Sequence, residues 1–214
     1  GAAGNVSRLA GDRMTPVAAP NTNTRKAADV TLGKREQVAA RLPWERLRDQ
    51  ATAARRDSTE NLDELVALFT KNAEAAGIKV VRAADKAAAC RAVMAALDAS
   101  PQVIIKSKSM VTEEIGLRHH MEVSGFTVYE TDLGEWIVQV RGELPSHVTA
   151  PAIHLSAAQI ADTLSGVLGR KLSSDPTALT GEATEYLRKP LRMARLGISG
   201  ANFLIAETGE VVVI

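Results

Sequence analysis

Short apolar segments alternate with helical segments between residues 61 and 130, and this alternation constrains the fold more than any other feature. It predicts helices over 61–77, 84–99 and 109–124, and strands over 78–81, 102–106 and 126–130. Short apolar strands that alternate with helices usually form a parallel sheet that is covered on both faces. The expected fold class is therefore α/β, with a mostly parallel sheet flanked by helices.

The rest of the chain keeps this rhythm less closely. Residues 131–154 contain two prolines and two histidines, predict strand and loop, and are numerous enough to cover a site. Ser156 and Gln159 form a capping-box pattern before a helix, and Asp175-Pro176 opens another helix that Pro190 should end. Residues 198–214 predict a hairpin around Thr208-Gly209. The last residues are apolar, so we expect the C-terminal part of the domain to be incomplete.

The N-terminal third predicts a different organisation. Residues 1–30 are polar and should form a flexible segment, and residues 31–57 a helical arm with a thin apolar stripe. Pro43 should start or kink a helix, and Trp44 is a candidate anchor. Such an arm packs weakly on its own chain or contacts another subunit, including a second copy. The α/β domain itself should span residues 58–214.

Composition excludes several classes of function. A net charge of +1 provides no field for attracting nucleic acid. No apolar run reaches the roughly 20 residues that span a bilayer, and no secretory signal is present, so we expect a cytoplasmic protein. The single cysteine, Cys90, is expected to be a small buried hydrophobe. One thiol excludes an intramolecular disulfide and an iron–sulfur cluster held by this chain alone.

Polar side chains follow the strand at 102–106, in the stretch VIIKSKSMVTEE. Lys106, Ser107, Lys108 and Ser109 would lie between a strand end and a helix start, where a carboxylate or phosphate anion can bind. The plain alternative is that Ser109 or Thr112 only caps the helix, with Glu113 well placed in its first turn. The residues alone leave both interpretations open.

Other candidate residues lie farther along the chain. Asp132 and Glu135 follow the strand at 126–130 and could act as acid or base, or form structural ion pairs. His147 and His154 could donate a proton, but no third ligand suggests a metal site. In GISGAN, Gly200 would allow a ligand to approach closely and Asn202 could bind a carbonyl or carboxylate; a structural bend is the alternative.

Four blocks in order, KSKSMVTEE, ETDLGEW with IVQV, PSHVTAPAIH and GISGANFLIAETGEVVV, resemble the LUD domain of the lactate utilization protein B family. The resemblance implies a fold similar to the NagB/RpiA/CoA-transferase-like proteins. It also implies an iron–sulfur subunit of a bacterial system that oxidises L-lactate to pyruvate. The partners would be the other subunits, and the 4Fe-4S clusters would lie in a cysteine-rich region outside this chain, which itself needs no cofactor.

The resemblance also gives a set of site residues, in which the 106–109 segment and Glu113 face the other candidates named above and Glu207. It assigns no catalytic residue among Glu113, Asp132, Glu135, His154 and Glu207. Two further hypotheses remain open. One is an isomerase- or transferase-like enzyme for a phosphorylated or CoA-linked metabolite, by analogy of fold alone. The other is a module that binds partner subunits.

Overall fold

The computed structural model describes residues 22–97, 102–147 and 150–214. These divide into two compact units. The first comprises residues 83–200 and the start of the first described helix, and the second comprises residues 26–82 and 201–214.

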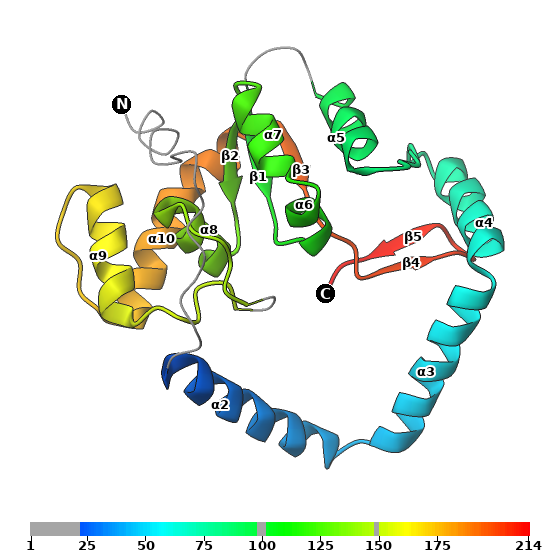
Figure 1. The fold of residues 1–214 in the computed structure, drawn as a ribbon, viewed down its shortest axis with the longest axis horizontal. Coiled ribbons are helices and arrows are strands. Elements are labelled where there is room, and N and C mark those ends of the chain that lie inside the picture. Colours follow the sequence, from blue (N-terminus) through cyan, green and yellow to red (C-terminus); the bar gives the residue numbers. More distant parts are fainter. Residues whose placement is uncertain (1–21, 98–101, 148–149) are drawn as a thin grey trace. The chain divides into compact units, whose positions relative to one another are not determined.

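A three-stranded parallel sheet forms the centre of the first unit (Figure 1). Its strands are β1 (Val103–Lys106), β2 (Thr127–Glu130) and β3 (Leu196–Ile198), in the order β2-β1-β3. In this register Lys106 is opposite Glu130 on one side and Ile198 on the other. The carboxyl ends of the three strands therefore meet at one edge. The α/β fold class with a parallel sheet flanked by helices is confirmed.

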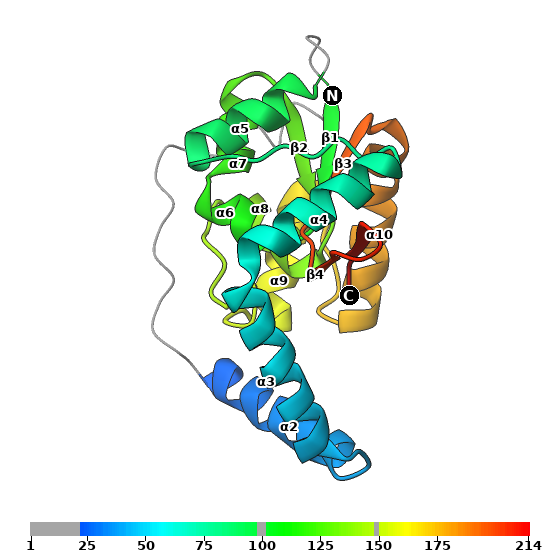
Figure 2. The ribbon, with the colours of Figure 1, turned by 90° about the vertical axis from the view of Figure 1, so that its right-hand side faces the viewer.

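Helices cover both faces of this sheet. On one face lie α5 (Lys86–Ala95), α6 (Met110–Glu114) and α7 (Leu117–Val123), and Figure 2 shows α5 beside α7. Their core contains Cys90, Ile104, Leu117, Met121 and Val128, so Cys90 is buried as predicted. On the other face lie α8 (Leu133–Arg141), α9 (Ala157–Leu168) and α10 (Pro176–Met193). Their core is built around Trp136, whose ring centroid lies 5.2 Å from that of Tyr186.

Helix α8 corrects the prediction of strand and loop over residues 131–154. The apolar run IVQV is part of this helix, and the helix buries Trp136, Ile137, Val138 and Val140. The Asp132 side chain accepts a hydrogen bond from the Glu135 N–H and caps the start, and Gly142, with φ of 66°, ends the helix. Gln139 also bonds the outer edge of β2, through the Val128 C=O and the Glu130 N–H. Because consecutive residues of this helix are buried, its sequence does not show apolar residues repeating every 3.6 positions.

Three smaller predictions were also wrong. Residues 78–81 form no strand, because within the described chain they pair with no neighbouring strand. The helix predicted over 109–124 is divided into α6 and α7 at Gly116, whose φ is 66°. Pro190 lies inside α10 and does not end it; the helix continues to Met193. The capping box of Ser156 and Gln159 and the start of α10 at Asp175-Pro176 are confirmed.

In the second unit, α4 (Leu62–Ala75) contacts a two-stranded antiparallel hairpin of β4 (Phe203–Ile205) and β5 (Glu210–Val212). The hairpin is confirmed, with its turn at Gly209, where φ is 75°. The Asn72 side chain donates hydrogen bonds to the Ala206 and Glu207 carbonyls and ties the turn to α4. In the described part of the chain, no helix is long and apolar enough to cross a membrane.

The arm consists of α2 (Thr22–Ala39), which belongs to the second unit from Lys26 onward, and α3 (Trp44–Glu60). Residues 22–30, predicted to be flexible, are helical, as their Ala, Lys and Arg content favours. The remaining 21 residues of the predicted flexible segment lie outside the described chain. Pro43 precedes α3, and the Arg35 guanidinium lies 5.1 Å from the Trp44 ring centroid. No residue of α3 is buried, which agrees with the predicted weak packing of the arm.

Candidate functional site

The carboxyl ends of β1 and β2 each place a charged side chain in the interior. Lys106 is completely buried, and Glu130 is 1% exposed. The Lys106 Nζ lies 3.0 Å from both carboxylate oxygens of Glu130. Because the two residues are register partners at the ends of neighbouring apolar strands, the sheet itself brings their charges together.

Two further charged groups complete this buried cluster. The Lys106 Nζ also lies 2.9 Å from a carboxylate oxygen of Glu113, which projects from α6. Arg118 on α7 places its Nε 3.7 Å from Glu130, while its Nη1 bonds Glu122 one turn away. The positive charge of Lys106 is therefore already balanced by two carboxylates, so Lys106 is not available to bind an anion.

Burial shifts the proton equilibria of the cluster. Removal from water raises the pKa of Glu130 to about 7, even though Lys106 and Arg118 act in the opposite direction. For Lys106, burial would lower the pKa, but Glu130 and Glu113 outweigh it and the pKa is raised. Lys106 therefore stays charged, whereas Glu130 can gain or lose a proton near neutral pH.

The helix-cap interpretation of Ser109 is borne out. Its side chain accepts a hydrogen bond from the Thr112 N–H and caps α6. Ser107 instead donates to the Ser199 hydroxyl, 2.9 Å away, and Ser199 donates to the Gly200 carbonyl. A Cβ added at Gly200 would lie 3.0 Å from Ser109, so this glycine allows the β3 end to approach the cap closely.

Glu135 and Asp132 lie at the start of α8, next to the cluster. Glu135 is only 5% exposed. Within the described residues, its carboxylate has no hydrogen-bond or ion-pair partner. Burial raises the pKa of Glu135, and the nearby charges of Glu113 and Asp132 raise it further, against Lys106 and Lys108. A mostly buried carboxyl with a raised pKa, beside other charged groups, is a strong candidate for function.

The surroundings of Lys108 differ from those of Lys106. Lys108 is half-buried, and no ion pair joins it to another described residue. It acts on Glu135 through its charge. Of the two lysines in the segment 106–109, Lys108 is therefore the one that is available for an anion. We call Lys106, Ser107, Lys108, Glu113, Arg118, Glu130, Asp132, Glu135, Ser199 and Gly200 the strand-edge site.

The two candidate histidines lie in the segment after α8, outside this cluster. The His154 ring bonds Ser146 through Nδ1 at 2.8 Å and Glu143 through Nε2 at 3.0 Å. Burial opposes ionisation of Glu143, but hydrogen bonds from Arg141 and His154 outweigh it and lower its pKa. This arrangement fastens the segment to α8. His147 is exposed.

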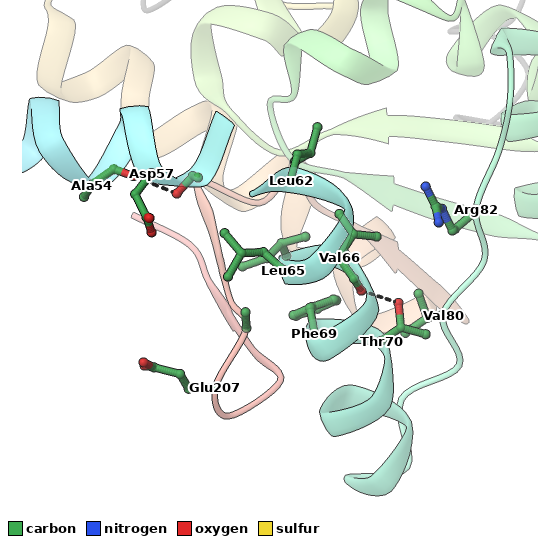
Figure 3. A pocket seen from close by; sticks show the side chains of 13 residues that line it. Ala54, Asp57, Leu62, Leu65, Val66, Phe69, Thr70, Val80, Arg82 and Glu207 are labelled. Carbon is green, nitrogen blue, oxygen red and sulfur yellow. Dashed lines mark hydrogen bonds between the residues drawn. The ribbon is translucent and has the colours of Figure 1, made fainter. Parts of the chain in front are cut away.

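Asn202 and Glu207 belong to the second unit, so the structure does not place them with the strand-edge site. The Asn202 side chain accepts a hydrogen bond from the Ile214 N–H. Glu207 lies at the rim of a cavity of about 500 Å³ inside the second unit (Figure 3). The wall of this cavity is mainly apolar and includes Leu65 and Phe69 from α4. Arg82 lines a different side of the cavity.

The donor groups of this chain do not fit an iron–sulfur cluster. Cys90 is the chain's single cysteine, and its thiol is buried at 3.5 Å from the Ile115 carbonyl. In the parts of the chain that the structure describes, no group of three or more metal-ligating side chains gathers around a common point.

Sequence reasoning overlooked Glu130, Arg118 and Ser199. A signal for Glu130 was present: two apolar strands, VIIK and TVYE, each end in a charge, and the charges are opposite. Parallel neighbours with such ends would pair them, as the structure shows. Arg118 gave no signal beyond its spacing from Glu122, and the position of Ser199 depended on the pairing of β3 with β1.

Comparison with known proteins places the sequence of this chain in a family. The family model of the LUD domain matches residues 66–214. A protein named lactate utilization protein B from Bacillus cytotoxicus is 38% identical over 190 residues, which are 88% of this chain and 38% of that protein. Proteins of the same name from Bacillus thuringiensis and Bacillus anthracis are 37% identical over the same shares.

This chain spans about 38% of the length of these relatives. No solved structure matches it. Because the family model covers well over half of the residues, the chain belongs to the LUD domain family.

Proposed function

We propose that this chain is the α/β part of a protein for lactate utilization, and that its strand-edge site binds a small carboxylate such as L-lactate or pyruvate. The names of the relatives support the metabolic role. The observation that carries the binding proposal is the position of the polar cluster at the carboxyl ends of parallel strands, where ligands bind in open α/β sheets.

The contacts suggest how such a ligand would be held. Lys108 supplies a cation that has no ion-pair partner within the described chain. The Ser107 and Ser199 hydroxyls, now bonded to each other, can turn to a carboxylate or to the hydroxyl of a 2-hydroxy acid. Lys106 stays bound to Glu113 and Glu130 and acts as the support of the site.

The oxidation itself would need an electron acceptor that this chain does not supply. A single buried cysteine cannot hold a 4Fe-4S cluster. In our proposal, the 4Fe-4S clusters are bound either by additional polypeptide, such as the longer relatives have, or by partner subunits. The LUD domain contributes ligand binding and subunit contacts. We therefore expect that these 214 residues do not oxidise lactate alone.

Calorimetric titration with L-lactate and with pyruvate tests the binding proposal. The parent chain should bind at least one of them, and Lys108→Ala should weaken binding by roughly 10- to 150-fold, because a charge-assisted hydrogen bond contributes roughly 1.5–3 kcal/mol. Lys71→Ala removes an exposed lysine of α4 and is the matched control. Equal affinities of the Lys108 and Lys71 variants would exclude the proposed role of Lys108.

One observation favours a second candidate, an isomerase- or transferase-like reaction. Glu130 has a pKa of about 7 and Glu135 is buried with a raised pKa, and such carboxyls suit proton transfer at neutral pH. Exchange of the methyl protons of acetyl-CoA, a CoA-linked metabolite, with deuterated water, catalysed by the parent and lost in Glu135→Gln, would support this candidate. Exchange at the uncatalysed rate would end it for this class of substrate.

A further inference from the structure

The charges of the strand-edge site are unfavourable for binding an anion as they stand. Three cations face four carboxyl groups, and two of the cations are already engaged, Lys106 with Glu113 and Glu130, and Arg118 with Glu122 and Glu130. Of these three cations, only Lys108 has no ion pair with another described residue. A bound carboxylate would bring one more negative charge next to Glu135 and Asp132.

Glu135 is the group on which this added charge would act most strongly. Its carboxyl is nearly buried and has no hydrogen-bond or ion-pair partner among the described residues, so nothing fixes it in the ionised state. The charged groups that act on it are Glu113 from α6, Lys106 from β1, Asp132 at the α8 cap and Lys108 after β1. Two of these are negative, and Lys106 is shared with other carboxylates.

We propose, building on the proposed function, that a small carboxylate binds to the strand-edge site together with one proton, which Glu135 takes up. Protonation removes the repulsion between Glu135 and the ligand, and it gives Glu135 a donor O–H that can bond a ligand oxygen. A protonated carboxyl in an apolar setting is a known way to bind oxyanions. Burial already raises the pKa of Glu135 in the absence of ligand, so the negative charge of the ligand has to raise this pKa by less for a proton to be taken up.

Glu130 is the main alternative acceptor of the proton. It differs from Glu135 because both its oxygens lie 3.0 Å from the Lys106 ammonium, and protonation would weaken that ion pair. Glu135 can take up a proton without losing any bond that the structure describes. The geometry therefore points to Glu135, and the two residues can be separated by experiment.

The experiment is calorimetric titration of the whole chain with pyruvate and with L-lactate at pH 7.5, in two buffers of different ionisation enthalpy. The slope of binding enthalpy against buffer enthalpy gives the number of protons taken up. We expect close to one proton per ligand, and an affinity that falls up to tenfold per pH unit at higher pH. Glu135→Gln should bind with no proton uptake and little dependence on pH. Glu114→Gln, at an exposed position of α6, is the control and should behave like the parent.

Each outcome decides between the proposals. Binding by the parent without proton uptake overturns the proton linkage and leaves the proposed function standing. Proton uptake that persists in Glu135→Gln overturns the assignment to Glu135 and moves it to another group such as Glu130. Absence of binding by the parent contradicts the proposed function itself and this inference with it. The parent measurement alone decides the linkage, even if the variant folds poorly.

Discussion

Lys106 is the cation that balances the buried carboxylate of Glu130 and the partly buried carboxylate of Glu113. We expect Lys106→Met to lower the free energy of unfolding by about 3–5 kcal/mol, because Glu130 would remain buried beside Glu113 without its main cation. Chemical denaturation followed by Trp136 fluorescence measures this loss. Lys71→Met, on the exposed face of α4, should change stability by less than about 0.5 kcal/mol. Similar effects of the two substitutions would show that the Lys106 charge is not needed for stability.

Glu130 should give the stability of the protein a specific dependence on pH. Its pKa is raised from 4.5 to about 7 in the folded state, so between these values the folded state binds more protons than the unfolded state. Stability must then fall as pH rises through this window, by up to about 3 kcal/mol. Denaturation at several pH values, for the parent and for Glu130→Gln, isolates this contribution.

Glu130→Gln tests this pH dependence of stability directly, because glutamine has no titrating proton. The decline between pH 5 and pH 7 should be smaller in Glu130→Gln than in the parent. Identical slopes would mean that Glu130 has an ordinary pKa in the folded state.

At the scale of elements, the turn of the hairpin is fixed against α4 by the absence of a side chain at Gly209. A Cβ there would lie 2.4 Å from the Ala73 backbone N, and φ is 75°. Gly77 has a φ of 87° but open space around it. We expect Gly77→Ala to cost roughly 1–2 kcal/mol of backbone strain, and Gly209→Ala to cost more, because α4 and the turn must also separate.

Thermal unfolding of both variants, with hydrogen exchange of the α4 amides, measures the difference. Gly209→Ala should also speed exchange in α4, whereas Gly77→Ala should not do so to the same extent. Equal losses of stability would show that the hairpin turn is not packed on α4 as described.

The elements show which part of the fold the sequence can predict. Helices with one apolar face, such as α4, and ends with a capping pattern, such as Ser156–Gln159, were predicted correctly because their signals are local. Helix α8 was missed because it is buried nearly all round and its IVQV run looks like a strand. The run at 78–81 looks equally like a strand but pairs with no described neighbour, and pairing is not a local property.

The same distinction applies to the candidate site. The strand-end positions of the segment 106–109 and of Asp132 and Glu135 followed from the alternation of helices and strands. The burial of Lys106 between two carboxylates did not, because it depends on the register of β1 with β2 and on the position of α6. Whether Asn202 and Glu207 reach the site stays a prediction, since they belong to the other unit.

At the scale of the whole molecule, the arm contributes little to stability. Neither α2 nor α3 has a buried residue among those described. We expect a chain that lacks residues 1–57 to keep the parent's unfolding midpoint within about 3 °C, roughly the shift that 1 kcal/mol produces in a protein of this size. Trp136, which is completely buried, reports on the sheet in both chains.

A change in assembly state on this truncation, measured by size-exclusion chromatography with light scattering, would identify the arm as a subunit contact. A large drop in the unfolding midpoint would instead show that the arm packs on its own chain, against the present account.

In our proposal, this LUD domain binds a small carboxylate at the carboxyl edge of the parallel sheet. Nuclear magnetic resonance tests it most directly, by titrating the isotope-labelled chain with pyruvate and mapping which backbone amides shift. We expect saturable shifts that concentrate at residues 106–113, 130–135 and 199–200. Saturable shifts confined to other residues, or no shifts up to millimolar pyruvate, would contradict it.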